Sequence, residues 1–392
     1  MASEHTIFDR PLLRRRRQRV AAHAARHDFL LQRVADDFAE RLSLVRREFP
    51  VAANIGAHHG VLTERLLALP SIGSMIEMDP AFVLGQTQET DGETRLPSPL
   101  RGGVGGGGGG NTARPVAEVN HENAPQVQTS KDSSRQAQHP TPRIIPRLSA
   151  TRSGAGSNPS PEGRGTPLIA SGGKTRARIV ADEEALPFAP ASLDLAVSGL
   201  ALHHVNDLPG ALVQIRRALK PDGLFLGALL GGETLKELRE AWLIAEDEVS
   251  GGASPRVAPF ADVRDLGGLL QRAGFALPVA DTDIVHATYA SPLNLMHEIK
   301  AMGASNVLTA RRRVPVTRKL LFRAAEVYSE RFALPDGRIP ATFEIITLTA
   351  WVPHESQQKP LQPGSAKARL AEALGVREQS AGEKVVPDRS KE

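Results

Sequence analysis

A chain of 392 residues is long enough for two or three domains, and its hydrophobic content of 41% supports a sizeable core. The sequence contains no cysteine, which excludes disulfides, thiolate metal sites and cysteine nucleophiles. The net charge of +4 does not indicate a nucleic-acid-binding domain, because residues 85–176 hold 11 Lys or Arg against 7 Asp or Glu and the rest of the chain is neutral.

Membrane insertion and secretion are not expected. No apolar stretch reaches the roughly 18–20 residues that a membrane span requires, and none near the N-terminus has the form of a signal peptide. We therefore expect a cytoplasmic protein with no transmembrane segment. The basic run from Arg14 to Arg17 is most simply the solvated face of a helix, and contact with acidic lipid or a partner is the alternative.

An N-terminal helical extension is predicted over residues 1–48. Within it, residues 11–47 look helical, because apolar side chains recur at every fourth position with charged residues between them. The recurring side chains are Leu30, Val34, Phe38 and Leu42. One face of this helix is expected to be buried and the other to face water.

The start of a βαβ unit comes after the helical extension. Residues 51–56 form a short apolar run that ends in glycine, residues 61–69 predict a helix, and Ile72 to Met78 is a second apolar run. The second run stops at Asp79-Pro80, so we expect a strand to end there.

Residues 85–176 have the composition of a disordered insertion. Eight of the nine residues from Gly102 to Gly110 are glycine, and Pro, Ser, Thr, Gly and Arg make up most of the segment after Gly110. Such a segment buries too little apolar surface to offset its ordering entropy. A tolerated loop insertion is the simplest interpretation, since loop closure costs only about 0.6 kcal/mol per doubling of length. A regulatory or binding segment is the alternative.

Strands and helices alternate again after the insertion. Strands are predicted near 178–181, 194–202, 224–230, 279–287 and 340–352, and helices near 208–219, 234–248, 261–273, 292–302 and 316–332. This alternation predicts an α/β fold with a Rossmann-like, doubly wound and mostly parallel sheet. The domain is expected over residues 49–84 and 177–360, with a helical subdomain at about 234–335, and a flexible C-terminal tail is expected over 361–392.

Three polar features lie at the carboxyl ends of successive predicted strands, where open α/β sheets bind ligands. The first is the loop Asn54-Ile-Gly-Ala-His-His-Gly60, whose glycines allow a tight turn and a close approach of the backbone to a ligand. Taken alone this loop is a weak signal, because it has two glycines where a dinucleotide-binding loop has three.

The second feature is Asp79, at the end of the second strand. A carboxylate at this position can accept hydrogen bonds from both hydroxyls of a ribose. Glu77 lies two residues earlier and faces the same way, so it is an alternative acceptor. A turn-forming aspartate before Pro80 is the purely structural interpretation.

The third feature is Asp182-Glu183-Glu184, which precedes Leu186-Pro-Phe188. An acceptor here can take the exocyclic amine of an adenine, with an apolar residue against the ring. Considered alone, the segment is equally compatible with an ordinary polar loop.

Together these segments resemble the class I S-adenosylmethionine-dependent methyltransferases. The resemblance rests on the glycine loop, the acid one strand later and a series of later motifs. Those motifs are Ala181-Asp-Glu-Glu-Ala-Leu-Pro-Phe188, Ser192-Leu-Asp-Leu-Ala-Val-Ser198, Leu202-His-His-Val205 and Leu219-Lys-Pro-Asp-Gly-Leu-Phe225. The later motifs are the more specific part of the pattern.

Further motifs resemble the family of mitochondrial complex I assembly factor 5 and its bacterial relatives, which are similar to the malonyl-carrier-protein methyltransferase of biotin synthesis. They are Ile7-Phe-Asp-Arg10, Val205-Asn-Asp-Leu-Pro209, Gly227-Ala-Leu-Leu-Gly-Gly-Glu-Thr-Leu235, Ser254-Pro-Arg-Val-Ala-Pro-Phe260, Ala301-Met-Gly-Ala-Ser-Asn306 and His354-Glu-Ser-Gln357. The resemblance covers nearly all of the chain outside residues 85–176.

The resemblance implies S-adenosyl-L-methionine as the cofactor. The residues that it implies as cofactor-binding are Asn54, Gly56, Ala57, Gly60, Asp79, Asp182 and Glu183. The family's loop usually begins with an acid and contains Gly-Cys-Gly, whereas this chain has Asn54 and then Gly56-Ala57-His58. In the site that the resemblance implies, the His58 side chain crowds the methionine part of the cofactor. The neutral Asn54 side chain does not offset the ammonium charge of that part. We therefore expect weaker cofactor binding than in a typical member, or a degenerate site.

Methyl transfer is the favoured activity. It needs binding and in-line positioning more than acid or base catalysis, so the absence of a catalytic motif does not count against it. His203 and His204 come after the fourth strand, where this superfamily often lines its substrate side, and are candidate catalytic residues. The alternative is that one of these histidines is buried and the other exposed.

Two other functions fit the same resemblance. The assembly factor is associated with hydroxylation of an arginine in a complex I subunit, which would make the partner a subunit of NADH–quinone oxidoreductase and permit peripheral membrane contact. His203, His204 and His354 have no spacing that supports an iron site, and no metal site is expected. A non-catalytic assembly factor with a vestigial site is the third possibility. The fold cannot choose among the three.

Overall fold

The computed structural model describes residues 6–82, 126–129, 166–169, 174–358 and 375–376. The chain divides into two compact units, Met1–Pro353 and His354–Glu392, and the sheet and the candidate site both lie in the first. The predicted tail over 361–392 and most of the predicted insertion over 85–176 lie outside the described residues, so both stay predictions. Within the insertion the structure describes two short strands and the start of a third.

A nine-stranded sheet forms the centre of the first unit, in the order β3-β8-β9-β7-β6-β1-β2-β5-β4. The strands are β1 Phe49–Ile55, β2 Ile72–Met78, β3 Gln126–Thr129, β4 Thr166–Ile169, β5 Thr175–Ile179, β6 Leu193–Gly199, β7 Leu219–Leu230, β8 Ala276–Tyr289 and β9 Ile339–Trp351. Strands β5, β2, β1, β6 and β7 are parallel, while β9 is antiparallel to both β7 and β8. The predicted doubly wound, mostly parallel sheet is confirmed.

The direction of winding reverses at β1. β2 and β5 lie on one side of β1, and β6, the strand that follows β5 in the sequence, lies on the other side. Asn54 pairs in register with Glu77 of β2 and Val197 of β6, so the three strands end close together. Open α/β sheets bind ligands at such a reversal, beyond the carboxyl ends of the strands.

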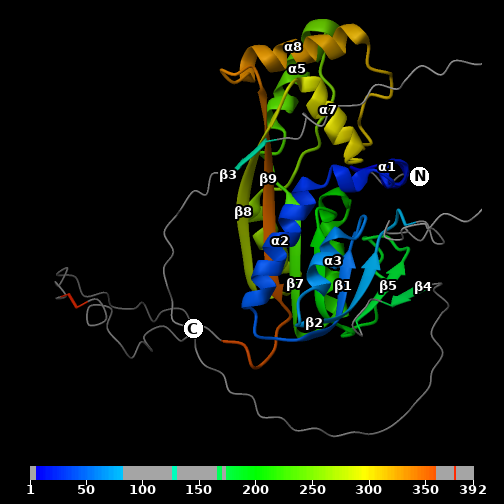
Figure 1. Ribbon diagram of the computed structural model, residues 1–392, viewed down its shortest axis with the longest axis vertical. Helices are drawn as coiled ribbons and strands as arrows, with labels where there is room; N and C mark the ends of the chain where they lie inside the picture. Colours follow the sequence, from blue (N-terminus) through cyan, green and yellow to red (C-terminus); the bar gives the residue numbers. More distant parts are fainter. Residues whose placement is uncertain (1–5, 83–125, 130–165, 170–173, 359–374, 377–392) are drawn as a thin grey trace, which may run out of the picture. The chain divides into compact units, whose positions relative to one another are not determined.

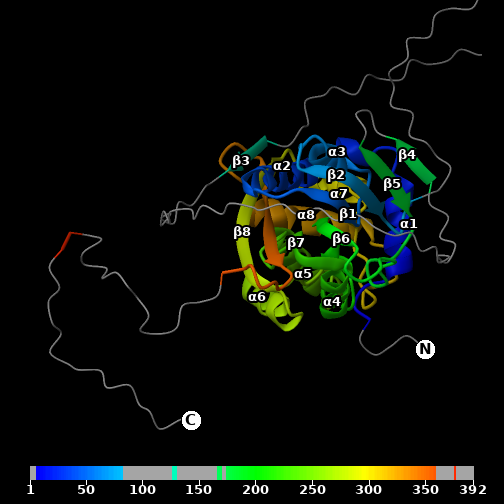
Figure 2. The ribbon, with the colours of Figure 1, turned by 90° about the horizontal axis from the view of Figure 1, so that it is seen from below.

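Helices cover both faces of the sheet, as Figure 2 shows. Helices α2 (Phe29–Leu44) and α3 (Val61–Leu67) pack on one face, and α4 (Leu208–Ala218) and α6 (Val263–Arg272) on the other. Each contributes an apolar stripe at helical spacing, such as Phe38 and Leu42 of α2, both almost fully buried. Burying one such side chain contributes roughly 1.5–3 kcal/mol, so these stripes hold the layers together.

A second group of helices gathers at one end of the sheet (Figure 1). It consists of α5 (Lys236–Ser250), α7 (Pro292–Ala301) and α8 (Arg318–Phe332), whose apolar faces pack with β8 and β9. The buried Tyr328 hydroxyl donates a hydrogen bond to the Pro340 carbonyl at 2.6 Å, which ties α8 to β9. These helices lie within the interval of about 234–335 for which a helical subdomain is predicted, while β8 and α6 in the same interval belong to the sheet and its other face.

The N-terminal extension is helical as predicted over 11–47, and it consists of two helices joined through a short turn. Helix α1 spans Arg10–Val20, a 3-10 turn spans Ala24–Arg26, and α2 begins at Phe29. The alanine-rich linker carries no helix breaker, so local propensity does not explain the change of direction. Packing explains the change of direction between α1 and α2. Leu13 of α1 lies in a small separate apolar cluster with Val307 and Leu308, away from the face that α2 covers.

Candidate functional site

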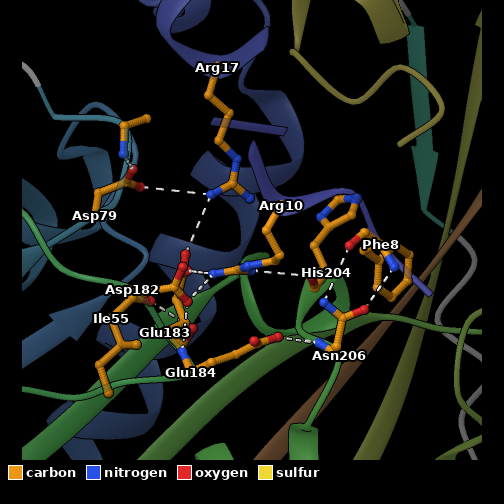
Figure 3. Close-up of polar contacts among 12 residues, drawn as sticks. Phe8, Arg10, Arg17, Ile55, Asp79, Asp182, Glu183, Glu184, His204 and Asn206 are labelled. Carbon is orange, nitrogen blue, oxygen red and sulfur yellow. Dashed lines mark hydrogen bonds and ion pairs between the residues drawn. The ribbon is translucent and has the colours of Figure 1, made fainter. Parts of the chain in front are cut away.

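The three polar features of the sequence meet at the carboxyl ends of β1, β2 and β5. Asn54 lies near the end of β1, the loop 56–60 follows that strand, Asp79 follows β2 and Asp182–Glu184 follows β5. Helix α1 lies across these ends (Figure 1), and its Arg10 and Arg17 side chains point at the acids (Figure 3). The structure therefore brings together the residues that the resemblance implied as cofactor-binding.

Gly56 is required by its surroundings. Its φ of +72° lies in the left-handed region, and a Cβ added there would stand 2.1 Å from the Cβ of Ala201 and 3.2 Å from Oε1 of Glu183. Ala57 is buried beside it, and its N–H donates to the Met78 carbonyl at 2.9 Å. The loop after β1 is thus tied to the end of β2.

Asn54 and Gly60 support the loop from the α3 side. Asn54 is fully buried, and its Nδ2 donates to the Thr63 hydroxyl at 3.0 Å. Its Oδ1 has no hydrogen-bond partner among the described residues. Gly60 has a φ of +94° and is the N-cap of α3. Asn54 is therefore engaged with α3, and only its Oδ1 is free to accept a hydrogen bond.

Asp79 is held in place by the loop it faces. The side chain is 1% exposed, its Oδ2 accepts from the His58 N–H at 2.9 Å, and its Oδ1 accepts from the Ala81 N–H at 2.7 Å. The second bond is the turn-forming interaction that its position before Pro80 suggested. Each oxygen keeps a further lone pair for a ligand hydroxyl.

Glu77 is occupied by the protein itself. Its buried carboxylate accepts from Arg176 Nη2 at 2.7 Å and from Arg178 Nε at 2.6 Å. A carboxylate paired with two guanidinium groups has little remaining capacity for a ligand hydroxyl. Between the two acceptors that the sequence left open, the geometry favours Asp79.

The acids after β5 pair with two arginines of α1. Arg10 donates to Asp182 at 2.6 Å and also to Glu183, which is fully buried. Arg17 Nη1 stands 3.6 Å from Glu183 Oε1 and 3.8 Å from Asp79 Oδ2. Burial raises the pKa of Glu183, although the charges of Arg10 and Arg17 oppose the shift. Glu184 instead accepts from the Asn206 N–H.

The sequence interpretation missed Arg10 and Arg17. It treated Arg14 to Arg17 as a solvated face, whereas the Arg17 side chain is 11% exposed and points at the acids. Helical spacing held the missing signal. Arg10, Leu13 and Arg17 stand three and four residues apart and therefore share one face, and Leu13 is buried.

Three neutral histidines border the acids. Burial, followed by the charge of Arg17, lowers the pKa of His203 to about 3. Burial also lowers the pKa of His204 and of His58 well below the usual value. Side chains whose conjugate acids have such a low pKa are poor proton acceptors near neutral pH. These side chains can therefore serve as neutral hydrogen-bonding groups rather than general bases.

The predicted split between one buried and one exposed histidine is wrong. His204 is buried. Its ring packs edge-on against Phe8, with 5.6 Å between the ring centroids, and its centroid lies 4.2 Å from that of the His203 ring. His203 is half-buried, and its ring centroid lies 5.7 Å from that of Phe260. Within the described part of the chain, neither Nδ1 atom has a hydrogen-bond partner.

A cavity of ≈ 240 Å³ opens beside the acids. Its polar lining includes Arg17, His58, Asp79 and His203, and its apolar lining includes side chains from α1, α2 and residues 302–304. A concave, mostly apolar cavity with a few converging polar groups is the usual form of a small-molecule site.

Metal-binding clusters and membrane-spanning helices are both absent from the described residues. No group of three or more His, Asp or Glu side chains there is arranged to hold a metal ion. Over the same residues, no helix is both long enough and apolar enough to span a bilayer.

The doubly wound sheet, with the glycine loop and the acids at the point where its winding reverses, has the form expected from the resemblance to class I methyltransferases. The family profile described as "Methyltransferase domain" matches residues 166–227. The resemblance stated from the sequence is thereby confirmed at the level of the domain.

Two curated proteins show what the chain is similar to. It is 45% identical over 194 residues to the mitochondrial arginine-hydroxylase NDUFAF5 of Danio rerio, a match that covers 50% of this chain and 60% of that protein. It is 40% identical over 173 residues to the malonyl-[acyl-carrier protein] O-methyltransferase of Halorhodospira halophila, covering 44% of this chain and 57% of that protein. Each match spans less than two thirds of the relative's length.

Among solved structures, the phosphoethanolamine N-methyltransferase 2 of Haemonchus contortus is similar at 11% identity and a TM-score of 0.36. That similarity covers 81% of this chain and 52% of the other. It adds nothing to the functional assignment.

Proposed function

We propose that this protein binds S-adenosylmethionine as a methyltransferase-like enzyme that acts in the maturation of respiratory complex I. One observation carries the proposal. The acceptors Asp79, Asp182 and Glu183 stand at the ends of neighbouring strands beside Gly56, and buried Glu183 Oε1 lacks a hydrogen-bond partner among the described residues. A buried polar atom without a partner is costly, and a ligand donor would satisfy it.

The nucleoside half of the cofactor suits these residues. Asp79 would accept hydrogen bonds from the ribose hydroxyls, and Asp182 or Glu183 from the adenine amine. Gly56 keeps the loop after β1 close to Ala201 and Glu183, because a Cβ at this position would clash with Ala201. When bound, S-adenosylmethionine supplies a methyl group activated by a sulfonium. The chain's own contribution is to bind, orient and exclude water.

Arginine hydroxylation on the same scaffold is the second candidate. One observation favours it, the 45% identity over 194 residues to the arginine-hydroxylase NDUFAF5 of Danio rerio. In either case we propose a subunit of NADH–quinone oxidoreductase as the partner and a cytoplasmic location at the inner face of the membrane. The NDUFAF5 relatives are named arginine-hydroxylases, which supports an arginine side chain as the group acted on.

Calorimetric titration of S-adenosylmethionine tests the cofactor assignment. Asp79→Ala is expected to weaken binding by about 100-fold, because a hydrogen bond to a charged acceptor contributes about 1.5–3 kcal/mol. Asp265→Asn is the matched control, because Asp265 is exposed on α6. Absence of binding by the folded wild-type protein would contradict the proposal, and so would equal binding by the Asp79 variant.

Mass spectrometry distinguishes the candidate reactions when complex I subunits are incubated with the protein and S-adenosylmethionine, or with the protein, dioxygen and a reductant. Methylation adds the mass of a methylene group, whereas hydroxylation adds that of an oxygen atom. A subunit that changes by neither mass, although the protein binds both it and the cofactor, would favour a non-catalytic assembly factor.

A further inference from the structure

His58 occupies an unusual place in the loop after β1. Its backbone has a φ of +52°, in the left-handed region that non-glycine residues seldom adopt. The imidazole Nε2 donates to the Gly199 carbonyl at 3.0 Å, while the backbone N–H of the same residue donates to Asp79. One residue thus binds both the acid after β2 and the end of β6.

The imidazole of His58 spans the crevice at the reversal of the sheet. Gly199 is the last residue of β6, and His58 comes after β1, its parallel neighbour. The crevice beyond these two strands is where open α/β sheets hold their ligands. The side chain joins the two walls of this crevice.

The hydrogen bond from the His58 imidazole to the Gly199 carbonyl is costly to break. Burial and the charge of Arg17 lower the pKa of His58 and keep it neutral, which leaves a single N–H, and that N–H must point at the carbonyl it contacts. Releasing the side chain would leave a carbonyl and an imidazole to find new partners. Unmaking a buried hydrogen bond costs about 1–3 kcal/mol.

The position of the acids fixes which part of a ligand meets His58. With adenine at the acids after β5 and ribose at Asp79 after β2, the 5′ arm of the nucleoside extends toward β1 and β6. That direction leads into the space between His58 and Gly199. The amino-acid arm of S-adenosylmethionine therefore competes with the imidazole for the same space.

We propose that His58 determines ligand specificity, so that the site accepts adenine nucleosides without an amino-acid arm more readily than S-adenosylmethionine. S-Adenosylmethionine enters only when the imidazole leaves the Gly199 carbonyl. The inference rests on the proposed cofactor site and refines its ligand class. A 5′-thioether nucleoside is the ligand that meets all three acids and leaves His58 in place.

The test compares calorimetric titrations of S-adenosylmethionine and 5′-methylthioadenosine into the full chain. His58→Gly removes the imidazole and frees the backbone, whereas His58→Asn removes the imidazole and still tolerates the left-handed conformation. His59→Gln is the matched control, because the neighbouring imidazole contacts Asp28 at 2.8 Å instead of Gly199. Circular dichroism confirms that each variant is folded.

We expect the wild-type protein to bind 5′-methylthioadenosine at least as tightly as S-adenosylmethionine. Both His58 variants should tighten S-adenosylmethionine by about tenfold, equivalent to about 1.4 kcal/mol, with a much smaller change for the nucleoside. His59→Gln should leave the ratio of the two affinities at its wild-type value.

Three results would overturn the inference. An unchanged affinity ratio in both His58 variants, with binding that still depends on Asp79, refutes the role of His58 and leaves the proposed function intact. A gain in His58→Gly alone assigns the effect to the backbone. Failure of every folded protein to bind either ligand refutes the cofactor site and this inference together.

Discussion

Arg17 and Glu183 face each other without a direct hydrogen bond. Arg17 Nη1 stands 3.6 Å from Glu183 Oε1, and neither atom has a hydrogen-bond partner among the described residues although both are buried. Arg10 holds the other oxygen of Glu183 (Figure 3). Arg17 lines the cavity, and Glu183 lies behind it, so the pair offers one donor and one acceptor that still lack a hydrogen bond.

Arg10, Arg17 and Glu183 form a largely buried ion cluster. Removing Glu183 alone should destabilise the protein more than removing Glu183 together with Arg10. Glu183→Ala leaves Arg10 buried with a weaker counter-charge, so we expect the free energy of unfolding to fall by about 3 kcal/mol. The double variant Arg10→Met with Glu183→Leu removes both charges and should lose clearly less. Urea unfolding measures both.

An exposed ion pair provides the control for that comparison. Arg323 of α8 and Glu248 of α5 pair at 2.5 Å on the surface, where solvent screens the attraction, so Arg323→Ala should lower the free energy of unfolding far less than Glu183→Ala. If Glu183→Ala is as mild as this surface variant, the cluster does not stabilise the fold in the way argued.

The buried histidines should make stability depend on pH below about 6.5. The folded-state pKa of His203 is lowered from 6.5 to about 3, so the unfolded chain binds a proton in that interval and the folded protein does not. The contribution of neutral His203 to the free energy of unfolding is complete above pH 6.5. It is lost as the pH falls toward 3, by about 1.4 kcal/mol per pH unit. Glu183 has the opposite sign because its pKa is raised.

Urea unfolding at several pH values on both sides of the ordinary histidine pKa of 6.5 checks this dependence. His203→Gln should reduce the slope of stability against pH, because glutamine does not titrate. A slope that is the same in wild-type protein and variant would show that His203 takes up a proton in the folded state.

Local pattern predicted the sheet much better than it predicted the site. The run from Ile72 to Met78 forms β2 with the predicted ends, because an apolar run that stops at Asp-Pro admits few other structures. The sequence pattern places Leu219 at the end of a helix, whereas in the structure Leu219 begins β7. Its pairing with Leu193 of β6 accounts for the difference. Helical spacing could have placed Arg17 on the face of α1 that carries Leu13, but it could not name Asp79 and Glu183 as partners, because both are far away in sequence.

The N-terminal segment that carries Arg10 should depend on Asn206. The Oδ1 of Asn206 accepts from the N–H groups of Ile7 at 2.8 Å and Phe8 at 2.7 Å. Asn206→Ala leaves both donors without this acceptor, so we expect faster hydrogen exchange over residues 7–17. Asn294→Ala, which removes the side-chain acceptor of the Ser291 hydroxyl at the start of α7, is the control and should leave that segment protected. Unchanged exchange in Asn206→Ala would mean that other contacts hold the segment.

Gly56→Ala should abolish ligand binding through a steric clash. Gly251→Ala is the control, because it shares the backbone strain and lacks the clash. Both Gly56 and Gly251 have left-handed φ values, +72° and +66°, so alanine has a similar backbone cost of about 1–2 kcal/mol at each. Only at Gly56 of these two does a Cβ meet another atom, the Cβ of Ala201 at 2.1 Å, whereas nothing lies within 4 Å of the position at Gly251. Denaturation and calorimetric titration of the two variants should therefore diverge, with Gly251→Ala mildly destabilised and binding normally. Equal loss of binding in both would trace the effect to backbone strain and refute the claim that the loop after β1 is shaped by its contact with Ala201.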